Sequence, residues 1–147
     1  MSLISKDCII RSGKYAMFVA KEGGKKYTLL NPDKLFIEHI RIDGCVIPDK
    51  QKACDFLFRI ENQQVHYFVE MKGGEVVYAC EQILNTYQAL KKDIRTSSRL
   101  EARIVCKRNN VPKFDQMPDY IKLAKVFLAK GGHVKYGTNN EFKEICN

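Results

Sequence analysis

The chain has 147 residues, a length typical of one domain and sufficient to bury a core without metal or disulfide support. Its hydrophobic share of 45% lies in the globular range, and no stretch approaches the roughly 20 apolar residues of a membrane span. The net charge of +8 favours polyanionic partners such as nucleic acid, although many basic proteins bind none. Because the first residues lack the layout of a secretory signal, we expect a cytoplasmic protein with one domain over residues 1–147 and no membrane segment.

The first third of the chain is rich in predicted strands. Residues 15–20 and 26–30 are expected to form two strands around the hairpin turn Glu22-Gly23-Gly24-Lys25. Residues 35–42 predict a third strand, and residues 45–47 predict a short return strand. This β-rich part extends to about residue 52.

The rest of the chain alternates strands and helices. The predicted strands are residues 53–60 (ACDFLFRI), 65–73 (VHYFVEMKG), 100–107 and 134–136, and the predicted amphipathic helices are residues 75–92 and 118–130. The polar loop 61–64 suits a hairpin between the first two strands. This order predicts an α/β fold with a mixed, mainly antiparallel central sheet flanked by helices.

Cysteine usage argues against a metal site built on thiolates. The six cysteines are Cys8, Cys45, Cys54, Cys80, Cys106 and Cys146. None forms a Cys-x-x-Cys pair and only three histidines accompany them, so a structural zinc site is not expected. Cys54, Cys80 and Cys106 lie inside apolar runs, which is typical of small buried side chains in a reducing compartment.

The predicted hairpin over residues 53–73 places acidic groups together. If Ile60 pairs with Val65 across the loop, Asp55 lies opposite Glu70, and opposed residues share a face with Cβ atoms roughly 4.5–5.5 Å apart. Lys72 shares that face, because it is two positions beyond Glu70. The other face would then be apolar throughout: Cys54, Phe56, Phe58, Ile60, Val65, Tyr67, Val69 and Met71. A one-residue slip would mix apolar and polar faces, so burial favours this register.

Two adjacent carboxylates favour binding of a divalent cation. Like charges resist joint ionisation unless a cation lies between them. Mg²⁺ suits two carboxylates with water and phosphate oxygens completing its ligands, and Mn²⁺ is an equivalent candidate. Lys72 could then orient a water or stabilise charge on phosphate. The alternative is a surface ion-pair cluster in which Lys72 neutralises Asp55 and Glu70. A second tripeptide of the same type, Glu141-Phe142-Lys143, has no such hairpin and is assigned no function.

The stretches CDFLF, HYFVEMKGG, EVVYACEQILNTYQAL and ARIVC together resemble the PD-(D/E)XK nuclease superfamily, over about residues 53–107. The resemblance implies that Asp55 and Glu70 are metal ligands and that Lys72 is the catalytic lysine. It also implies a restriction-endonuclease-like core over residues 53–147, with extra N-terminal strands.

Additional site residues follow from the same resemblance. Gln82 matches a helix position near the active site of related nucleases, or is an exposed helix residue. Tyr87 lies on the apolar stripe of its helix and is expected in the core. Glu38 and Asp43 are the candidates for an upstream acid, since the N-terminal helix that usually supplies it is not evident. Asp43 precedes Gly44, which also suits a simple turn residue.

Basic residues after the first helix are candidate phosphate contacts, or a solvated edge: Arg95, Arg99, Arg103, Lys107 and Arg108. His39 and His66 are expected to be structural or exposed rather than catalytic. The leading hypothesis is a nuclease dependent on Mg²⁺ or Mn²⁺ that hydrolyses nucleic acid, with DNA favoured. The alternatives are an inactive module of the same fold that binds nucleic acid, and an interaction subunit that forms a homodimer or binds a partner protein.

Overall fold

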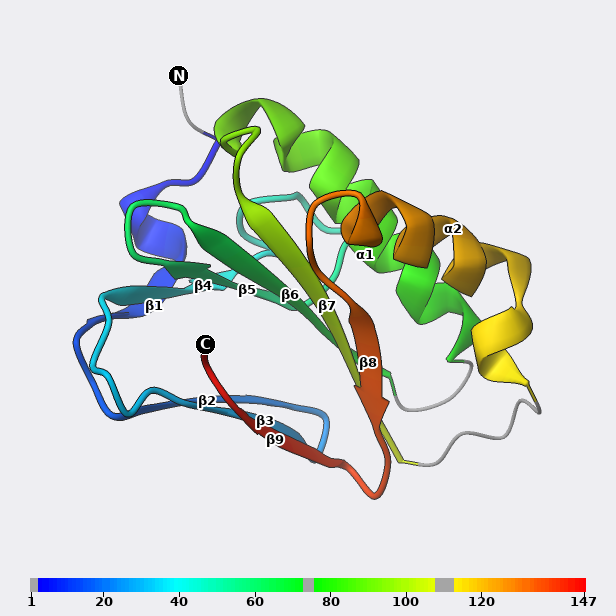
Figure 1. The fold of residues 1–147 in the computed structure, drawn as a ribbon, viewed down its shortest axis with the longest axis horizontal. Coiled ribbons are helices and arrows are strands. Elements are labelled where there is room, and N and C mark those ends of the chain that lie inside the picture. Colours follow the sequence, from blue (N-terminus) through cyan, green and yellow to red (C-terminus); the bar gives the residue numbers. More distant parts are fainter. Residues whose placement is uncertain (1–2, 73–75, 108–112) are drawn as a thin grey trace.

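The computed structural model describes residues 3–72, 76–107 and 113–147, and in these ranges the protein is an α/β structure of two sheets and two α-helices. Figure 1 shows three layers, with α1 and α2 on one face of the larger sheet and a smaller sheet on the other face. We call these faces of the larger sheet the helix face and the small-sheet face.

The larger sheet has the strand order β1-β4-β5-β6-β7-β8. Its strands are β1 (Ile9–Gly13), β4 (Ile37–Arg41), β5 (Phe56–Ile60), β6 (Val65–Lys72), β7 (Arg99–Cys106) and β8 (Val134–Gly137). The first four are antiparallel neighbours, whereas β6, β7 and β8 are parallel. The parallel pairs require crossovers, which α1 (Val77–Leu90) and α2 (Pro118–Leu128) provide.

The smaller sheet contains β2 (Met17–Glu22), β3 (Lys25–Leu30) and β9 (Glu141–Ile145). β2 and β3 form an antiparallel hairpin, and β9 joins β3 in parallel. Three short 3₁₀ helices complete the described elements: η1 (Lys6–Cys8), η2 (Lys91–Asp93) and η3 (Phe114–Gln116).

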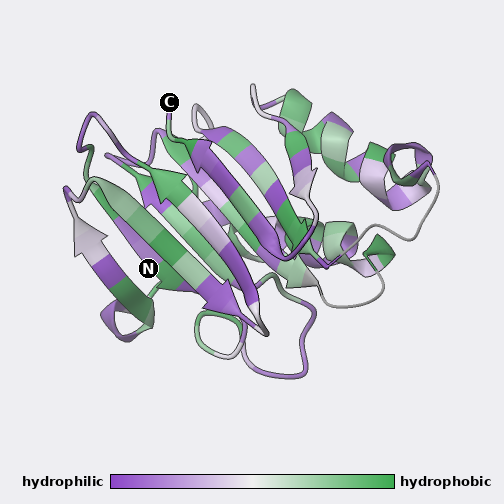
Figure 2. Ribbon diagram, turned by 90° about the horizontal axis from the view of Figure 1, so that it is seen from below, coloured by the Kyte–Doolittle hydropathy of each residue, from purple (hydrophilic) through white to green (hydrophobic). Residues whose placement is uncertain are grey.

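The central hairpin of β5 and β6 is buried on both faces. Leu57 and Phe68 pack with the helices, whereas Phe58 and Tyr67 pack with the smaller sheet. Figure 2 shows hydrophobic residues along the strands of both sheets and mostly hydrophilic residues in the connecting loops. Burial on the small-sheet face confirms the predicted apolar face from Phe56 to Met71. Cys54 is a correction, because it packs with the helices rather than beside Phe56.

Most predicted elements are present, within a few residues of their expected limits. The segment at 45–47 is a correction, because it forms turns and a single bridge between Asp43 and Ile47 rather than a strand. Two strands were not predicted. β1 is an edge strand with mostly exposed side chains, and β9 alternates exposed and half-buried residues around the tripeptide Glu141-Phe142-Lys143, so neither carries a strong apolar signal.

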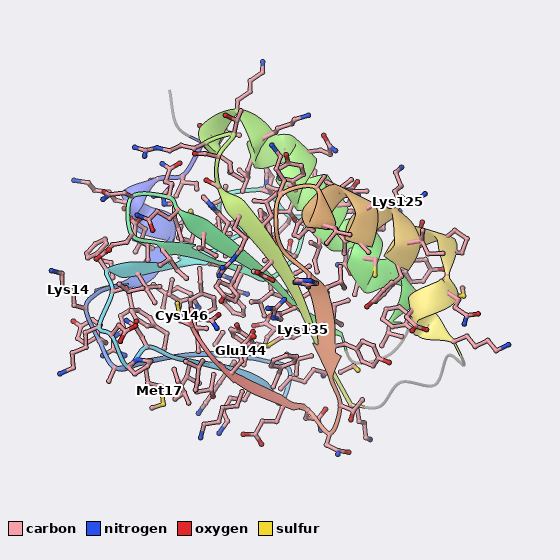
Figure 3. All side chains as sticks on the ribbon, in the orientation of Figure 1. Lys14, Met17, Lys125, Lys135, Glu144 and Cys146 are labelled. Carbon is pink, nitrogen blue, oxygen red and sulfur yellow. A yellow bond between two sulfur atoms is a disulfide. The ribbon has the colours of Figure 1, made fainter. Side chains whose placement is uncertain are left out.

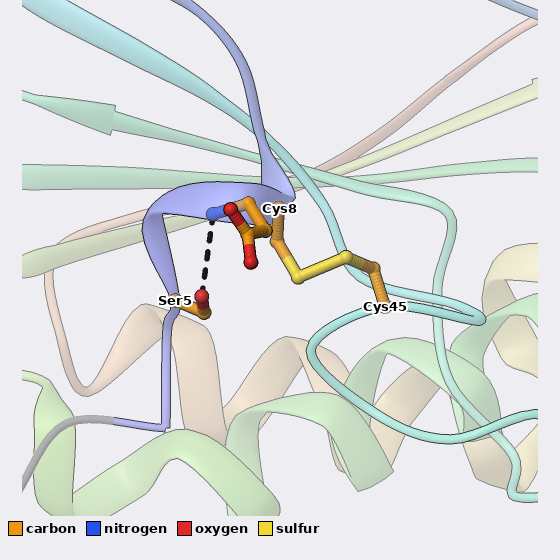
Figure 4. The surroundings of a disulfide bond; sticks show 4 residues. Ser5, Cys8 and Cys45 are labelled. Atoms are coloured by element: carbon orange, nitrogen blue, oxygen red, sulfur yellow. Dashed lines mark hydrogen bonds between the residues drawn. A yellow bond between two sulfur atoms is a disulfide. The ribbon is translucent and has the colours of Figure 1, made fainter.

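Cys8 and Cys45 form a disulfide that joins η1 to the turn after β4, with their Cα atoms 5.7 Å apart (Figure 4). Ser5 accepts a hydrogen bond from the Asp7 N–H at 3.2 Å and so caps η1 beside this bond. The other four cysteines are buried free thiols, as expected for Cys54, Cys80 and Cys106. Disulfides persist mainly in oxidising compartments, so this pair departs from the expected reducing environment. No helix in the described ranges is long and apolar enough to cross a membrane.

Candidate active site at the end of the β5–β6 hairpin

The register of β5 and β6 is the predicted one. Ile60 lies opposite Val65, and the ladder continues to Phe56 opposite Val69. Glu70 is the next residue of β6, whereas Asp55 lies in a bend that directly precedes β5, so the predicted strand pairing of Asp55 with Glu70 is not part of the ladder. The two acids are nevertheless adjacent, because the Asp55 N–H donates a hydrogen bond to the Glu70 carboxylate.

At this end of the hairpin, side-chain carboxylates bond to the backbone of the opposite strand. The Asp55 N–H donates to Glu70 Oε1 at 3.1 Å, and the Met71 N–H donates to Asp55 Oδ2 at 2.9 Å. The exposed fractions are 8% for Asp55 and 3% for Glu70. A carboxylate offers about four acceptor positions, so an N–H bond orients the group and does not prevent it from binding a cation. We call Asp55 and Glu70 the carboxylate pair.

Burial raises the pKa of Asp55 above its usual value, because the charged form is poorly solvated there. The hydrogen bonds from Met71 and Glu70 act in the opposite direction, and the charges of Glu22 and Asp43 raise the pKa further. A divalent cation would stabilise the charged form of such a group, because it supplies the opposite charge.

Asp43 lies at the same end of the sheet as the carboxylate pair. The Ile42 N–H donates to the Asp55 backbone oxygen at 2.9 Å, so Asp43 directly follows the residue that faces Asp55. Burial and the neighbouring charge of Asp49 raise the pKa of Asp43. Of the two candidate upstream acids, Asp43 is the one that approaches the pair.

Glu38 does not join the site, which corrects its assignment as an auxiliary acid. It pairs in register with Arg59, and Arg59 Nε lies 2.7 Å from Glu38 Oε1. Arg59 is four positions along β5 from Asp55, a separation of roughly 13 Å along a strand. Glu38 is therefore held in an ion pair elsewhere on β4.

Glu22 is an acid near the site, although its position in the sequence predicts only a hairpin turn. It ends β2 in the smaller sheet, and its Oε1 atom lies 3.2 Å from Arg41 Nη2 on β4. Its charge also contributes to the raised pKa of Asp55. No local signal could identify it, because the contact depends on how the two sheets pack.

Lys72 ends β6 in register with Cys106 of β7. Its backbone thus lies two positions beyond Glu70, as predicted, whereas its side chain lies outside the described residues. The same applies to Arg108, one of the predicted phosphate contacts.

Gln82 on α1 contacts the segment that leads into Asp55. Its Nε2 donates to the Ala53 backbone oxygen at 3.3 Å, and its buried Oε1 has no hydrogen-bond partner among the described residues. It lines a cavity of about 410 Å³ with Tyr78, Lys52 and Glu81, the last two joined by an ion pair of 2.8 Å. Gln82 therefore lines a cavity near the carboxylate pair, whereas Tyr87 lies in the core as expected, 4% exposed.

The predicted phosphate-binding residues do not form one surface. Arg103 is 3% exposed, and it lies 2.6 Å from Glu144 and 3.1 Å from Glu101. Arg99 pairs with Glu101 at 2.9 Å. Arg103 is thus a structural residue, which corrects its assignment, because burial and two ion pairs occupy its guanidinium. Arg95 and Lys107 are exposed and have no ion pair within the described ranges.

His39 and His66 are buried, and burial lowers the pKa of each to about 4. The His39 ring stacks on Phe58, with centroids 4.5 Å apart. Both are therefore neutral structural side chains at pH 7, in agreement with the expectation.

The carboxylate pair supplies enough protein ligands for Mg²⁺, although not for a metal that needs three or more. Within the ranges that the structure describes, no three or more His, Cys, Asp or Glu side chains cluster to hold an ion. Mg²⁺ is nevertheless commonly held by one or two carboxylates, with waters and substrate phosphate as its other ligands. The oxygen donors of Asp55 and Glu70, together with the unsatisfied amide oxygen of Gln82 nearby, fit that chemistry.

Comparisons of this chain with protein-family models, with curated proteins and with solved structures found no match. A function can therefore be proposed only from the sequence resemblance and the geometry of the site.

Proposed function

We propose that this protein is a divalent-metal-dependent nuclease of the PD-(D/E)XK type, in which Asp55 and Glu70 hold Mg²⁺ or Mn²⁺. The supporting observation is the pair of reciprocal carboxylate-to-backbone bonds, which fixes two buried acids side by side at the end of a hairpin. Nucleic acid is the proposed substrate, with DNA favoured, and the net charge of +8 is compatible with it.

The topology around the pair supports a restriction-endonuclease-like core. β4, β5 and β6 are consecutive antiparallel strands, α1 follows β6, and β7 returns parallel to β6. This is the arrangement that the resemblance implies: an acid on one strand, Glu-x-Lys on the next, then a helix and a strand. The smaller sheet of β2, β3 and β9 covers the face opposite the helices.

Each residue has a distinct part in the proposed reaction. Asp55 and Glu70 supply the cation's ligands, and their backbone bonds hold them oriented before substrate binds. When bound, the ion acidifies a water and polarises the phosphodiester. The ammonium of Lys72 orients the attacking water or stabilises the charge that develops on phosphate.

A second candidate is a catalytically inactive module of the same fold that binds nucleic acid or a partner protein. It is favoured by the absence, within the described ranges, of a cluster of three metal-ligating side chains. Under either candidate function, the proposed compartment of the protein is the cytoplasm. The four buried free thiols favour this compartment, whereas the Cys8–Cys45 disulfide argues against it.

The direct test is cleavage of plasmid or oligonucleotide in Mg²⁺ or Mn²⁺. We expect Asp55→Asn and Lys72→Ala to lower the rate by about 100-fold or more, as loss of one transition-state contact does. The matched control is Lys143→Ala, which alters the other Glu-x-Lys tripeptide, and it should cleave like the wild type. Equal cleavage by the wild type, Asp55→Asn and Lys72→Ala would exclude the proposed mechanism. Metal-independent binding without turnover would favour the second candidate.

A further inference from the structure

A cavity of about 620 Å³ lies between the tip of the β2–β3 hairpin and the turn that precedes β9. Its lining includes Lys21, Lys25 and Lys26 from the hairpin, and Asn139 and Asn140 from the turn. We call it the hairpin pocket. Its lining consists of three lysines, two asparagines, two glycines and the two acids Glu22 and Glu141, and none of the described residues that line it is aromatic.

Two contacts place the hairpin pocket at the same end of the larger sheet as the carboxylate pair. Glu22 lines the pocket and pairs with Arg41, the residue in register with Phe56 beside Asp55. On the other side, the Asn140 N–H donates to the Cys106 backbone oxygen at 2.9 Å, and Cys106 is in register with Lys72. The pocket therefore borders the carboxyl ends of the parallel strands, where ligands of open α/β sheets bind.

The balance of charge in the hairpin pocket favours an anion. Its two acids have cationic neighbours, since Glu22 lies 3.2 Å from Arg41 and Glu141 lies 3.6 Å from Lys26. Lys25 is only 9% exposed, and its Nζ donates to the Gly23 backbone oxygen at 3.0 Å, with no ion pair among the described residues. An ammonium has three donors, and a buried one needs a compensating charge. Phosphate oxygens supply both acceptors and charge.

We propose that the hairpin pocket binds the sugar–phosphate backbone of a nucleic-acid strand whose scissile phosphate lies at the carboxylate pair, an inference that rests on the proposed function. Lysines and amides contact phosphates without reading bases, so this contact is independent of sequence. In this proposal the pocket lysines supply the phosphate contacts that were predicted for Arg103, whose guanidinium is held in ion pairs within the protein.

The test is the salt dependence of binding, measured by fluorescence anisotropy of a labelled oligonucleotide in EDTA so that no turnover occurs. For the double variant Lys21→Ala, Lys25→Met, which removes the two pocket lysines without an ion pair among the described residues, the slope of log K against log salt should fall by about 1.8 with duplex DNA, or about 1.4 with a single strand, because each neutralised phosphate contributes about 0.9 or 0.7. Affinity should fall equally for unrelated sequences. Lys21→Ala alone, at an exposed position, should lower the slope by about half as much, and a thermal melt will show whether the double variant remains folded.

The matched control is Lys122→Ala, Lys125→Ala, which removes the same charge from exposed positions of α2, on the opposite face of the larger sheet (Figure 3). It should retain the wild-type slope. The inference is overturned if the two double variants lower the slope equally, if the hairpin variant binds like the wild type, or if the wild type does not bind. If the hairpin pocket binds nucleic acid but no metal-dependent cleavage occurs, the proposed nuclease function is excluded and the proposed role of the pocket remains. If cleavage occurs and does not depend on the pocket lysines, the proposed role of the pocket is excluded and the nuclease function remains.

Discussion

Two regions of the molecule bury charged side chains, and they do so in opposite ways. Between the sheets, Arg103 lies against Glu101 and Glu144, and Tyr27 donates a hydrogen bond of 2.6 Å to the same Glu144 oxygen. At the end of the β5–β6 hairpin, the carboxylate pair instead brings together two acidic side chains, which accept hydrogen bonds from backbone N–H groups. Figure 3 shows Glu144 pointing from β9 into the space between the sheets.

The difference distinguishes a structural cluster from a candidate binding site. Opposite charges that satisfy one another within the protein have no need of a ligand, and losing one of them leaves a buried charge. Like charges held close together by the backbone are costly until a cation arrives, which is a common property of functional sites. The following predictions test this contrast.

The largest effect is expected for Arg103→Met. This change leaves Glu101 and Glu144 without the guanidinium between them, and the free energy of unfolding should fall by about 3–5 kcal/mol. Urea denaturation monitored by circular dichroism measures it. Lys143→Ala, an exposed position on β9, is the control and should change stability by less than about 0.5 kcal/mol. A loss below about 1 kcal/mol for Arg103→Met would show that the cluster is not the structural element described.

A smaller effect is expected from metal binding. Mn²⁺ at ten times its dissociation constant should raise the free energy of unfolding by about 1.4 kcal/mol in the wild type, through mass action on the folded state. Thermal melts with Mn²⁺ and with EDTA measure the shift. Asp55→Asn should abolish it and Arg95→Ala, an exposed position, should keep it. If Asp55→Asn responds as strongly as the wild type, the ion binds elsewhere.

The smallest effect is expected for Asp55→Asn without metal. The amide retains an oxygen for the Met71 N–H and removes a poorly solvated charge that Glu22 and Asp43 repel, so stability at pH 7 should rise by about 0.5–1 kcal/mol. Folding raises the pKa of Asp55 above its unfolded value of 3.8, so the folded state holds the proton more readily. The wild type should therefore gain stability relative to the variant as pH falls from 7 through the raised pKa. A lower stability of Asp55→Asn at pH 7 would contradict the like-charge interpretation.

The carboxylate pair could be predicted from sequence because its determinants are local. Loop length and the alternation of apolar residues predicted the register of β5 and β6, and the last pair of that ladder, Phe56 and Val69, is adjacent to Asp55 and Glu70. The bend at Asp55 was not predicted. The helices were equally accessible, because their apolar residues recur at helical spacing over many positions.

The contacts between the two sheets could not be predicted in the same way. Arg103 pairs with Glu144 across 41 positions, and only the parallel addition of β9 to β3 brings them together. Glu22 reaches the site by the same packing. The Cys8–Cys45 bond likewise joins segments separated by 37 positions, which cysteine spacing alone does not reveal.

The parallel addition of β9 has a consequence for how the chain acquires its structure. β3 can complete its pairing only after β9, the last strand in the sequence, is in place. The hydrogen bond from Tyr27 to Glu144 accordingly joins residues 117 positions apart. Closing so long a loop is entropically slow, and contacts of high sequence separation delay folding. Until β9 is in place, the β2–β3 hairpin has an unpaired edge at β3, and such an edge favours transient association between chains.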